Sequence, residues 1–318
     1  MNSIMDRIRQ LARSGRVADG IALVGKLSEE GDPEACFILA NWRLWGFYGE
    51  RDLAQCHALL ERAGQAGFVE ASRLRAILTA NGTGRPSDVV AATQMLRELA
   101  PGDPDSARQL ELLDLMDPGS RGGLETETLS DDPPIRLLRN LLSVEECRYL
   151  MDKAQPALRP SMIIDPNTKR PVPNPVRTSS GMNFDPSLED LVVHAINRRI
   201  AAATETPVEC GELLHVLQYR PGEQFRPHLD SIPGAANQRH WTALVYLNEG
   251  YEAGGTVFTE LGVEAKGGVG DCLIFRNSIE GASDPRTRHA GRPVTSGVKW
   301  LASRWIRQQP VDPFELPH

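Results

Sequence analysis

The sequence has no long apolar run, few cysteines and no excess of basic residues. No stretch approaches the ~18–20 apolar residues that a transmembrane helix needs, and the N-terminus lacks the apolar core of a secretory signal. The 42 acidic residues outnumber the 35 basic ones and give a net charge of -7, which is unlike the basic surface of nucleic-acid-binding proteins. We therefore expect a cytoplasmic protein that binds neither membranes nor nucleic acid.

The cysteines are too few and too scattered for a disulfide framework. There are five, they lie far apart, and none forms a C-x-x-C pair that would suggest a thiolate zinc site. We expect them to be reduced and packed. With 41% hydrophobic and 24% charged residues over 318 positions, the composition is that of a globular protein long enough for two domains.

The first 117 residues predict helices, because apolar residues recur at spacings of three and four. The similar starts "GDPEA" at Gly31, "GFVEA" at Gly67 and "GDPDSA" at Gly102 are separated by 36 and 35 positions. Such a period is typical of helix-turn-helix solenoids. The pattern resembles Sel-one-like repeats of the tetratricopeptide class, which implies an α-solenoid domain that docks a protein partner. An irregular helical bundle is the alternative.

The rest of the chain changes character. Residues 118–134 are rich in Gly, Pro and acids without periodic apolar residues, which predicts a linker. Beyond it, short segments rich in β-branched and aromatic residues predict strands at 212–219, 241–247, 255–261, 271–275 and 298–306.

Two further segments, 142–154 and 187–204, predict helices, and Ser143 with Glu146 forms a capping box at the start of the first. Many short strands favour a jelly roll. We expect this domain over 135–310, with the two helices covering an outer sheet face and a tail at 311–318.

A candidate metal site lies in "FRPHLDSIP". His228 and Asp230 are two apart, so on a strand their side chains point to the same side and can converge on one ion. A single H-x-D is also common at protein surfaces. His289 offers a second imidazole, and two histidines with one carboxylate form the triad of non-haem Fe(II) oxygenases, which leaves half of the octahedral positions open.

Lys299 is unusual because it lies among apolar residues of the predicted strand 298–306. Facing sheets pack ~10 Å apart, so a lysine on one inner face could reach the far carboxylate of a short diacid whose other end chelates an ion opposite. 2-Oxoglutarate fits this description.

Five motifs in order resemble the catalytic domain of prolyl 4-hydroxylase-type 2-oxoglutarate and Fe(II)-dependent oxygenases. They are "VRTSSGMNF", "LQYRPGEQFRPHLD", "RHWTALVYLNEGYEAGGTVF", "GDCLIF" and "HAGRPVTSGVKWLASRWIR". The resemblance covers about residues 135–310. It implies that His228, Asp230 and His289 bind Fe(II), and that Lys299 pairs with the C5 carboxylate of 2-oxoglutarate.

The resemblance also assigns residues around the metal. It places Tyr219 and Thr256 in the cosubstrate pocket, Arg239 at the substrate and Trp305 near the iron. For these residues the alternatives are an ordinary core position or, for Arg239, a solvated loop charge.

The proline-rich stretch 162–184 disfavours regular helix or strand. The family resemblance implies a lid over a peptide substrate, with Arg177 and Ser179 near that substrate; a passive surface loop is the alternative. Two departures from the family lie on the substrate side and bear on prolyl specificity. Ser231 replaces an aromatic residue after H-x-D, and Arg307 replaces a histidine found in many peptide-hydroxylating members.

The implied activity is hydroxylation at carbon with Fe(II), 2-oxoglutarate and O2, releasing succinate and CO2, with ascorbate as an expected cofactor. We expect the substrate to be a prolyl residue of a peptide or protein that the repeats help to recruit. One alternative is a hydroxylase of a free amino acid or small metabolite, in which the repeats form a homodimer. Another is a non-catalytic scaffold or sensor.

Overall fold

The computed structural model describes residues 3–116, 125–165, 168–279 and 281–316. Two compact units make up the chain. The helical unit comprises Met1–Leu115 and Pro186–His194, and the sheet unit comprises Met116–Asp185 and Ala195–His318. None of the described helices is long and apolar enough to cross a membrane.

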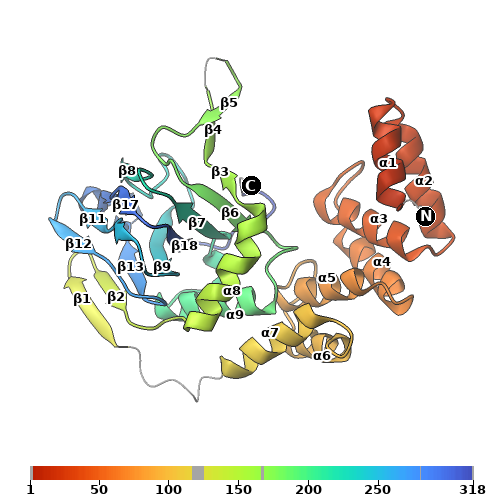
Figure 1. The fold of residues 1–318 in the computed structure, drawn as a ribbon, viewed down its shortest axis with the longest axis horizontal. Helices are drawn as coiled ribbons and strands as arrows, with labels where there is room; N and C mark the ends of the chain where they lie inside the picture. Colours follow the sequence, from red (N-terminus) through yellow and green to blue (C-terminus); the bar gives the residue numbers. More distant parts are fainter. Residues whose placement is uncertain (1–2, 117–124, 166–167, 280, 317–318) are drawn as a thin grey trace. The chain divides into compact units, whose positions relative to one another are not determined.

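In the helical unit, consecutive helices pack against one another along the chain (Figure 1). They are α1 (Ile4–Arg13), α2 (Val17–Glu29), α3 (Pro33–Trp45), α4 (Leu53–Gln65), α5 (Val69–Ala80), α6 (Val89–Leu99) and α7 (Pro104–Leu115). This arrangement buries small and aliphatic side chains, among them Val24, Leu44, Leu60, Leu78 and Leu96.

The repeat period coincides with equivalent local structures. Asp52 and Asp88, 36 positions apart, are the N-caps of α4 and α6, and each side chain accepts a hydrogen bond from the backbone amide three residues later. Gly31 and Gly67, also 36 apart, both have positive φ in the turns before α3 and α5. The assignment to the Sel-one-like class stays a prediction.

In the sheet unit, two antiparallel sheets face each other. The larger has the order β1-β2-β13-β9-β18-β7-β6-β3 and the smaller β12-β11-β16-β8. The strands of the larger sheet are β1 (Thr126–Ser130), β2 (Ile135–Leu138), β3 (Arg159–Pro160), β6 (Ser180–Phe184), β7 (Leu214–Tyr219), β9 (Arg239–Tyr246), β13 (Cys272–Arg276) and β18 (Lys299–Arg307). Those of the smaller sheet are β8 (Phe225–His228), β11 (Thr256–Phe258), β12 (Val263–Ala265) and β16 (His289–Gly291).

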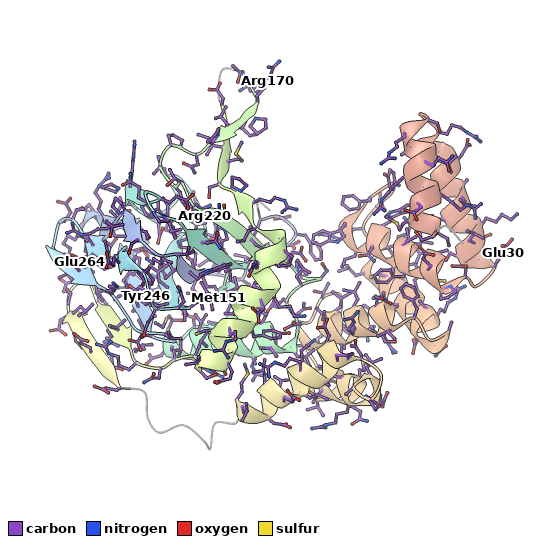
Figure 2. All side chains as sticks on the ribbon, viewed as in Figure 1. Glu30, Met151, Arg170, Arg220, Tyr246 and Glu264 are labelled. Carbon is purple, nitrogen blue, oxygen red and sulfur yellow. The ribbon has the colours of Figure 1, made fainter. Side chains whose placement is uncertain are left out.

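The core lies between these sheets. Tyr246 and Phe275 from the larger sheet pack in one cluster with Phe258 from the smaller, and Tyr246 lies in the interior of the unit (Figure 2). This arrangement confirms the predicted jelly roll. The described strand pairs outside the two sheets are β4 (Met162–Ile164) with β5 (Pro171–Pro173), β10 (Glu252–Ala253) with β17 (Val294–Ser296), and β14 (Ser278–Ile279) with β15 (Ala282–Ser283).

Two helices border the larger sheet. They are α8 (Val144–Ala154), which has the predicted Ser143–Glu146 capping box, and α9 (Leu191–Ala203). The buried Glu146 of α8 pairs with Arg199 of α9 at 2.8 Å. From β18, Arg304 donates to the carbonyl of Asn197 in α9 at 2.9 Å. Arg304 therefore lies on the outer face of β18, which leaves the alternate residues of this strand facing the core.

Two expectations need correction. The segment 118–134 contains a strand, because β1 pairs with β2 at the edge of the larger sheet; residues 118–124 lie outside the described residues. The stretch 162–184 is not one irregular loop. β4 and β5 form a hairpin with Arg170 near its tip, and β6 belongs to the larger sheet (Figures 1 and 2). In an isolated hairpin each strand pairs with one other strand. A proline, which has no backbone N–H to donate, can therefore lie where its nitrogen faces away from the partner strand.

The five cysteines, Cys36, Cys56, Cys147, Cys210 and Cys272, are all free and buried. This confirms the expectation of reduced, packed side chains. Short 3-10 turns at Gln155–Ala157, Val208–Cys210 and Pro285–Thr287 complete the described helical elements.

Candidate active site

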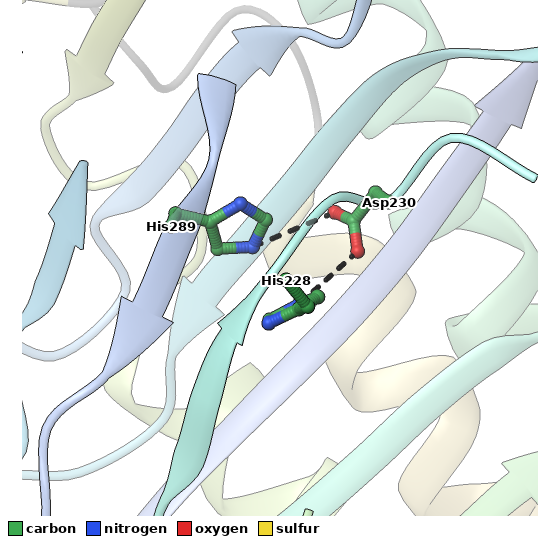
Figure 3. Close-up of side chains that lie close together, drawn as sticks. All are labelled: His228, Asp230 and His289. Carbon is green, nitrogen blue, oxygen red and sulfur yellow. Dashed lines mark ion pairs between the residues drawn. The ribbon is translucent and has the colours of Figure 1, made fainter. Parts of the chain in front are cut away.

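Two histidines and one aspartate bring their ligand atoms together inside the sheet unit. His228 ends β8, Asp230 follows two residues later, and His289 begins β16, directly opposite His228 in the antiparallel pairing. His228 Nε2 lies 3.4 Å from Asp230 Oδ1, and His289 Nε2 lies 3.7 Å from Asp230 Oδ2 (Figure 3). The three ligand atoms lie within 4.8 Å of one another, so one ion can contact all of them.

Backbone carbonyls orient both imidazole rings. Nδ1 of His228 donates to the carbonyl of Arg226 at 2.8 Å, and Nδ1 of His289 donates to that of Thr287 at 3.0 Å. When such a ring is neutral, donation from Nδ1 leaves its lone pair on Nε2, which faces the aspartate. Nε2 of His228 is buried and has no hydrogen-bond partner among the described residues. An unpaired buried acceptor of this kind fits a metal ligand.

A short hydrogen-bond chain holds the carboxylate of Asp230. Thr242 Oγ1 donates to Oδ2 at 2.6 Å and accepts from Asn277 Nδ2 at 2.8 Å. Burial by itself raises the pKa of Asp230, but the neighbouring imidazoles, first His289, and the hydrogen bond from Thr242 outweigh burial and lower it. Burial also lowers the pKa of His289. The group thus combines imidazole nitrogens with an ionised carboxylate.

This donor set fits an open Fe(II) site rather than a closed zinc site. Two imidazoles and a carboxylate leave positions for other ligands, whereas structural zinc takes four protein ligands. Within the part of the chain that the structure describes, no fourth His, Cys, Asp or Glu joins the group. Aromatic rings hold the imidazoles in place, since Phe225 stacks on His228 with 3.5 Å between centroids and Phe275 meets His289 edge-on at 4.7 Å.

A buried lysine faces the same cavity. Lys299 is 3% exposed, and its Nζ donates to the carbonyl of Gly254 at 2.7 Å. Among the described residues, no carboxylate pairs with this ammonium group. Burial, together with the charge of Lys266, lowers the pKa of Lys299 to about 8. A buried cation without an anion fits a site for a ligand carboxylate.

Tyr219 and Thr256 also line this cavity. Tyr219 is opposite Lys299 in the pairing of β7 with β18, and its ring centroid lies 5.6 Å from the ammonium. Burial raises the pKa of Tyr219, opposed by the charge of Arg177 and a hydrogen bond with Ser179. Thr256 Oγ1 accepts from the hydroxyl of Tyr246 at 3.5 Å. The roles of Tyr219 and Thr256 toward a cosubstrate stay predictions.

A buried glutamate missed at the sequence level organises two arginines. Nε and Nη2 of Arg239 donate to different oxygens of Glu212, each at 2.7 Å, and Nε of Arg307 donates to Oε1 at 2.6 Å. The Arg239 guanidinium lies 3.9 Å over the ring of Trp305, and its Nη1 donates to the backbone carbonyl of Asp230 at 3.3 Å. The sequence feature that could have indicated Glu212 is its charge at the start of the mostly apolar predicted strand 212–219.

A groove of about 430 Å³ adjoins the metal cavity. Its lining includes Arg159, Met162, Arg177, His215, Arg239 and Trp305, and Leu316 from the C-terminal tail. Arg177 and Trp305 also line the metal cavity, so the two spaces meet at these side chains. Ser179 is fully buried and lines neither space; its hydroxyl lies 3.4 Å from that of Ser161. Ser179 can therefore affect the site through Tyr219.

Comparison with known proteins gives matches to one family. Residues 214–307 match the family model of the 2OG-Fe(II) oxygenase superfamily. Prolyl 4-hydroxylase 1 of Arabidopsis thaliana is 37% identical over 209 residues, covering 59% of this chain and 74% of the relative. Probable prolyl 4-hydroxylase 3 of the same plant is 36% identical over 213 residues, with coverage of 59% and 74%.

Among solved structures, the collagen prolyl hydroxylase of Paramecium bursaria Chlorella virus 1, in complex with 2-oxoglutarate, is 27% identical. The match covers 54% of this chain and 95% of that chain, with a TM-score of 0.44. The region of the family model, 214–307, contains the three metal-site residues and Lys299, whereas Arg177 and Glu212 lie outside it.

Proposed function

The chain belongs to the 2-oxoglutarate–Fe(II) oxygenase superfamily, alongside plant prolyl 4-hydroxylases, and from this premise we propose that it hydroxylates a prolyl residue in a peptide or protein. The reaction uses Fe(II), 2-oxoglutarate and O2. One observation carries the proposal: a cavity with an open two-histidine, one-carboxylate group also contains the unpaired ammonium of Lys299.

In this proposal each side chain has a defined task. His228, Asp230 and His289 hold the metal through Nε2 and carboxylate oxygens, and Lys299 binds the distal carboxylate of 2-oxoglutarate. When bound, Fe(II) and 2-oxoglutarate supply the oxidation, in which O2 is consumed, succinate and CO2 are released, and one oxygen atom enters a substrate C–H bond. The backbone bonds to Nδ1 of both histidines keep the metal ligands oriented before binding.

The groove supports a peptide substrate over a free amino acid. Its volume of about 430 Å³ lies outside the metal cavity and continues from it, which gives room for residues on either side of the one that reacts. Arg239, held by Glu212, lines the groove and stacks on Trp305, which lies at the junction. A complete metal-binding group favours catalysis over a purely scaffolding role.

The direct test is succinate formation from 2-oxoglutarate with Fe(II) and proline-containing peptides, together with a mass gain of one oxygen atom in the peptide. His228→Ala should abolish both signals because it removes one of three metal ligands. His240→Ala is the matched control, since His240 contacts Ser278 and lies outside the metal group. Wild-type turnover in His228→Ala would refute the ligand assignment.

Other expectations stay predictions. These are docking of the protein substrate by the helical unit, formation of a homodimer, a cytoplasmic location and a requirement for ascorbate. The domain limits at 117 and 310 are also proposals, whereas the limit at 135 is corrected by β1, which belongs to the larger sheet. The short segment Pro186–His194 is grouped with the helical unit.

A further inference from the structure

The groove beside the metal cavity contains more positive charge than its own residues neutralise. Arg159, Arg177 and Arg239 line it, and Glu212 is the single carboxylate in its described lining. Both oxygens of Glu212 are already used, one by Arg239 alone and the other by Arg239 and Arg307 together. Glu212 therefore leaves the charge of Arg177 without compensation.

Arg177 has no acceptor for its guanidinium group. Its side chain donates no hydrogen bond and forms no ion pair with any residue that the structure describes, and its Nε is buried. Its closest aromatic contact is the ring of Phe225, 5.6 Å from the guanidinium carbon. Burial, together with the charge of Arg239, lowers the pKa of Arg177, and Tyr219 and Asp230 offset this only in part, as expected for a partly desolvated guanidinium that donates to no anion. In contrast, buried Arg304 donates to three backbone carbonyls.

The neighbouring unpaired groups are also donors. Nε1 of Trp305 is buried without an acceptor. His215 is 7% exposed and makes no hydrogen bond with the described side chains; burial, Arg177 and Arg239 lower its pKa to about 3. A neutral imidazole adds one N–H but no charge. Gly181 makes room for this ring, because a Cβ there would lie 2.3 Å from Nε2 of His215.

We propose that Arg177 binds a carboxylate of the substrate, so that the enzyme selects substrates with an acidic group next to the carbon that it hydroxylates. The inference rests on the proposed function, because it concerns the substrate of that reaction. Arg177 and Trp305 line both the groove and the metal cavity, so a carboxylate bound there is adjacent to a group that enters the cavity.

A carboxylate suits this site better than a peptide carbonyl. Guanidinium and carboxylate form charge-assisted hydrogen bonds about twice as strong as neutral ones, and often two at once. A carbonyl would accept a hydrogen bond but would leave the partly desolvated charge of Arg177 without an anion.

The carboxylate can come from two sources with the same chemistry. One is the side chain of Asp or Glu next to the reacting proline. The other is the free C-terminus of a peptide that ends close to that proline. The experiment therefore varies the two independently.

The test uses the full-length protein and measures peptide binding separately from turnover. Fluorescein-labelled peptides with one central proline carry Glu, Gln or Lys beside it, and each is prepared with a free and an amidated C-terminus. Binding is measured by anisotropy without O2, with Fe(II) and 2-oxoglutarate present. We expect the acidic member of a pair to bind about 10- to 100-fold more tightly than its neutral counterpart. Turnover is measured as succinate and hydroxylated peptide.

Variants of Arg177 separate a carboxylate site from a structural role. Arg177→Gln should bind Glu and Gln peptides equally, whereas the wild type should prefer the Glu peptide. Arg177→Lys should restore part of the preference because it keeps the charge without the planar pair of donors. Arg220→Gln is the matched control, because Arg220 is exposed and lines neither space; it should keep the full preference.

The inference and the proposed function fail in different ways. Equal binding of acidic and neutral peptides, no measurable binding of any peptide, or an acidic preference that survives Arg177→Gln would overturn the inference. Succinate release with any of these peptides would still support the proposed function. An acidic preference lost in Arg177→Gln, with no succinate formed by the wild type, would refute the hydroxylase and leave the carboxylate site standing.

Discussion

Replacing Lys299 with methionine is expected to stabilise the protein and to weaken its binding of 2-oxoglutarate. Lys299 is 3% exposed, and burial with the charge of Lys266 lowers its pKa from 10.5 to about 8. At ~1.4 kcal/mol per pH unit, the charged group costs the ligand-free fold about 3 kcal/mol at neutral pH. Methionine removes the charge at similar length but loses the hydrogen bond to Gly254, worth ~1 kcal/mol. The net gain is about 2 kcal/mol.

The sign of the pH dependence follows from the lowered pKa. Below pH 8, Lys299 is protonated in the folded and the unfolded protein, so the cost is fully present. Between pH 8 and 10.5 the unfolded chain binds more protons than the folded one, so the free energy of unfolding of the wild type rises relative to the variant. Above pH 10.5 the group is neutral in both states, and the advantage of methionine disappears.

Urea denaturation of the metal- and ligand-free proteins across this pH range is the assay. Lys266→Met is the matched control, because Lys266 is exposed and its removal should shift the pKa of Lys299 upward without removing the buried charge. 2-Oxoglutarate with Fe(II) should then stabilise the wild type and Lys266→Met but not Lys299→Met, whose KM for the cosubstrate should rise about 100-fold. If Lys299→Met were less stable than wild type at pH 7, or if their difference did not change between pH 8 and 10.5, the reasoning would be refuted.

Two further substitutions test the framework around the site. Glu212→Gln removes the shared anion of Arg239 and Arg307, both mostly buried, and should lower the free energy of unfolding by about 3 kcal/mol in urea denaturation; an unchanged midpoint would contradict a structural role. Ser143→Ala removes the cap that accepts from the amide of Glu146, and should cost ~1 kcal/mol in the same assay while kcat for 2-oxoglutarate stays unchanged. A fall in kcat would mean that α8 affects the site directly.

Local chemistry in the sequence predicts much of the site. The change from a helical to a two-residue period separates the solenoid-like region from the jelly roll, because side-chain direction follows backbone geometry. The spacing of His228 and Asp230 brings two candidate metal ligands to one side of a strand end, and the alternation in 298–306 places Lys299 on an inner face. These features depend on residues close in the chain, so they can be recognised without knowing the fold.

Only the tertiary structure decided which distant residues meet. The pairing of β16 with β8 sets His289 opposite His228, although 61 positions separate them. Glu212 escaped notice because nothing near it in the sequence indicates that Arg239 and Arg307 come to its carboxylate. Strand β1 lies in a segment that we expected to be a linker. Its sequence has no apolar periodicity, and it forms a strand because it pairs with β2. Strand register and buried ion pairs arise from long-range packing, which periodicity does not encode.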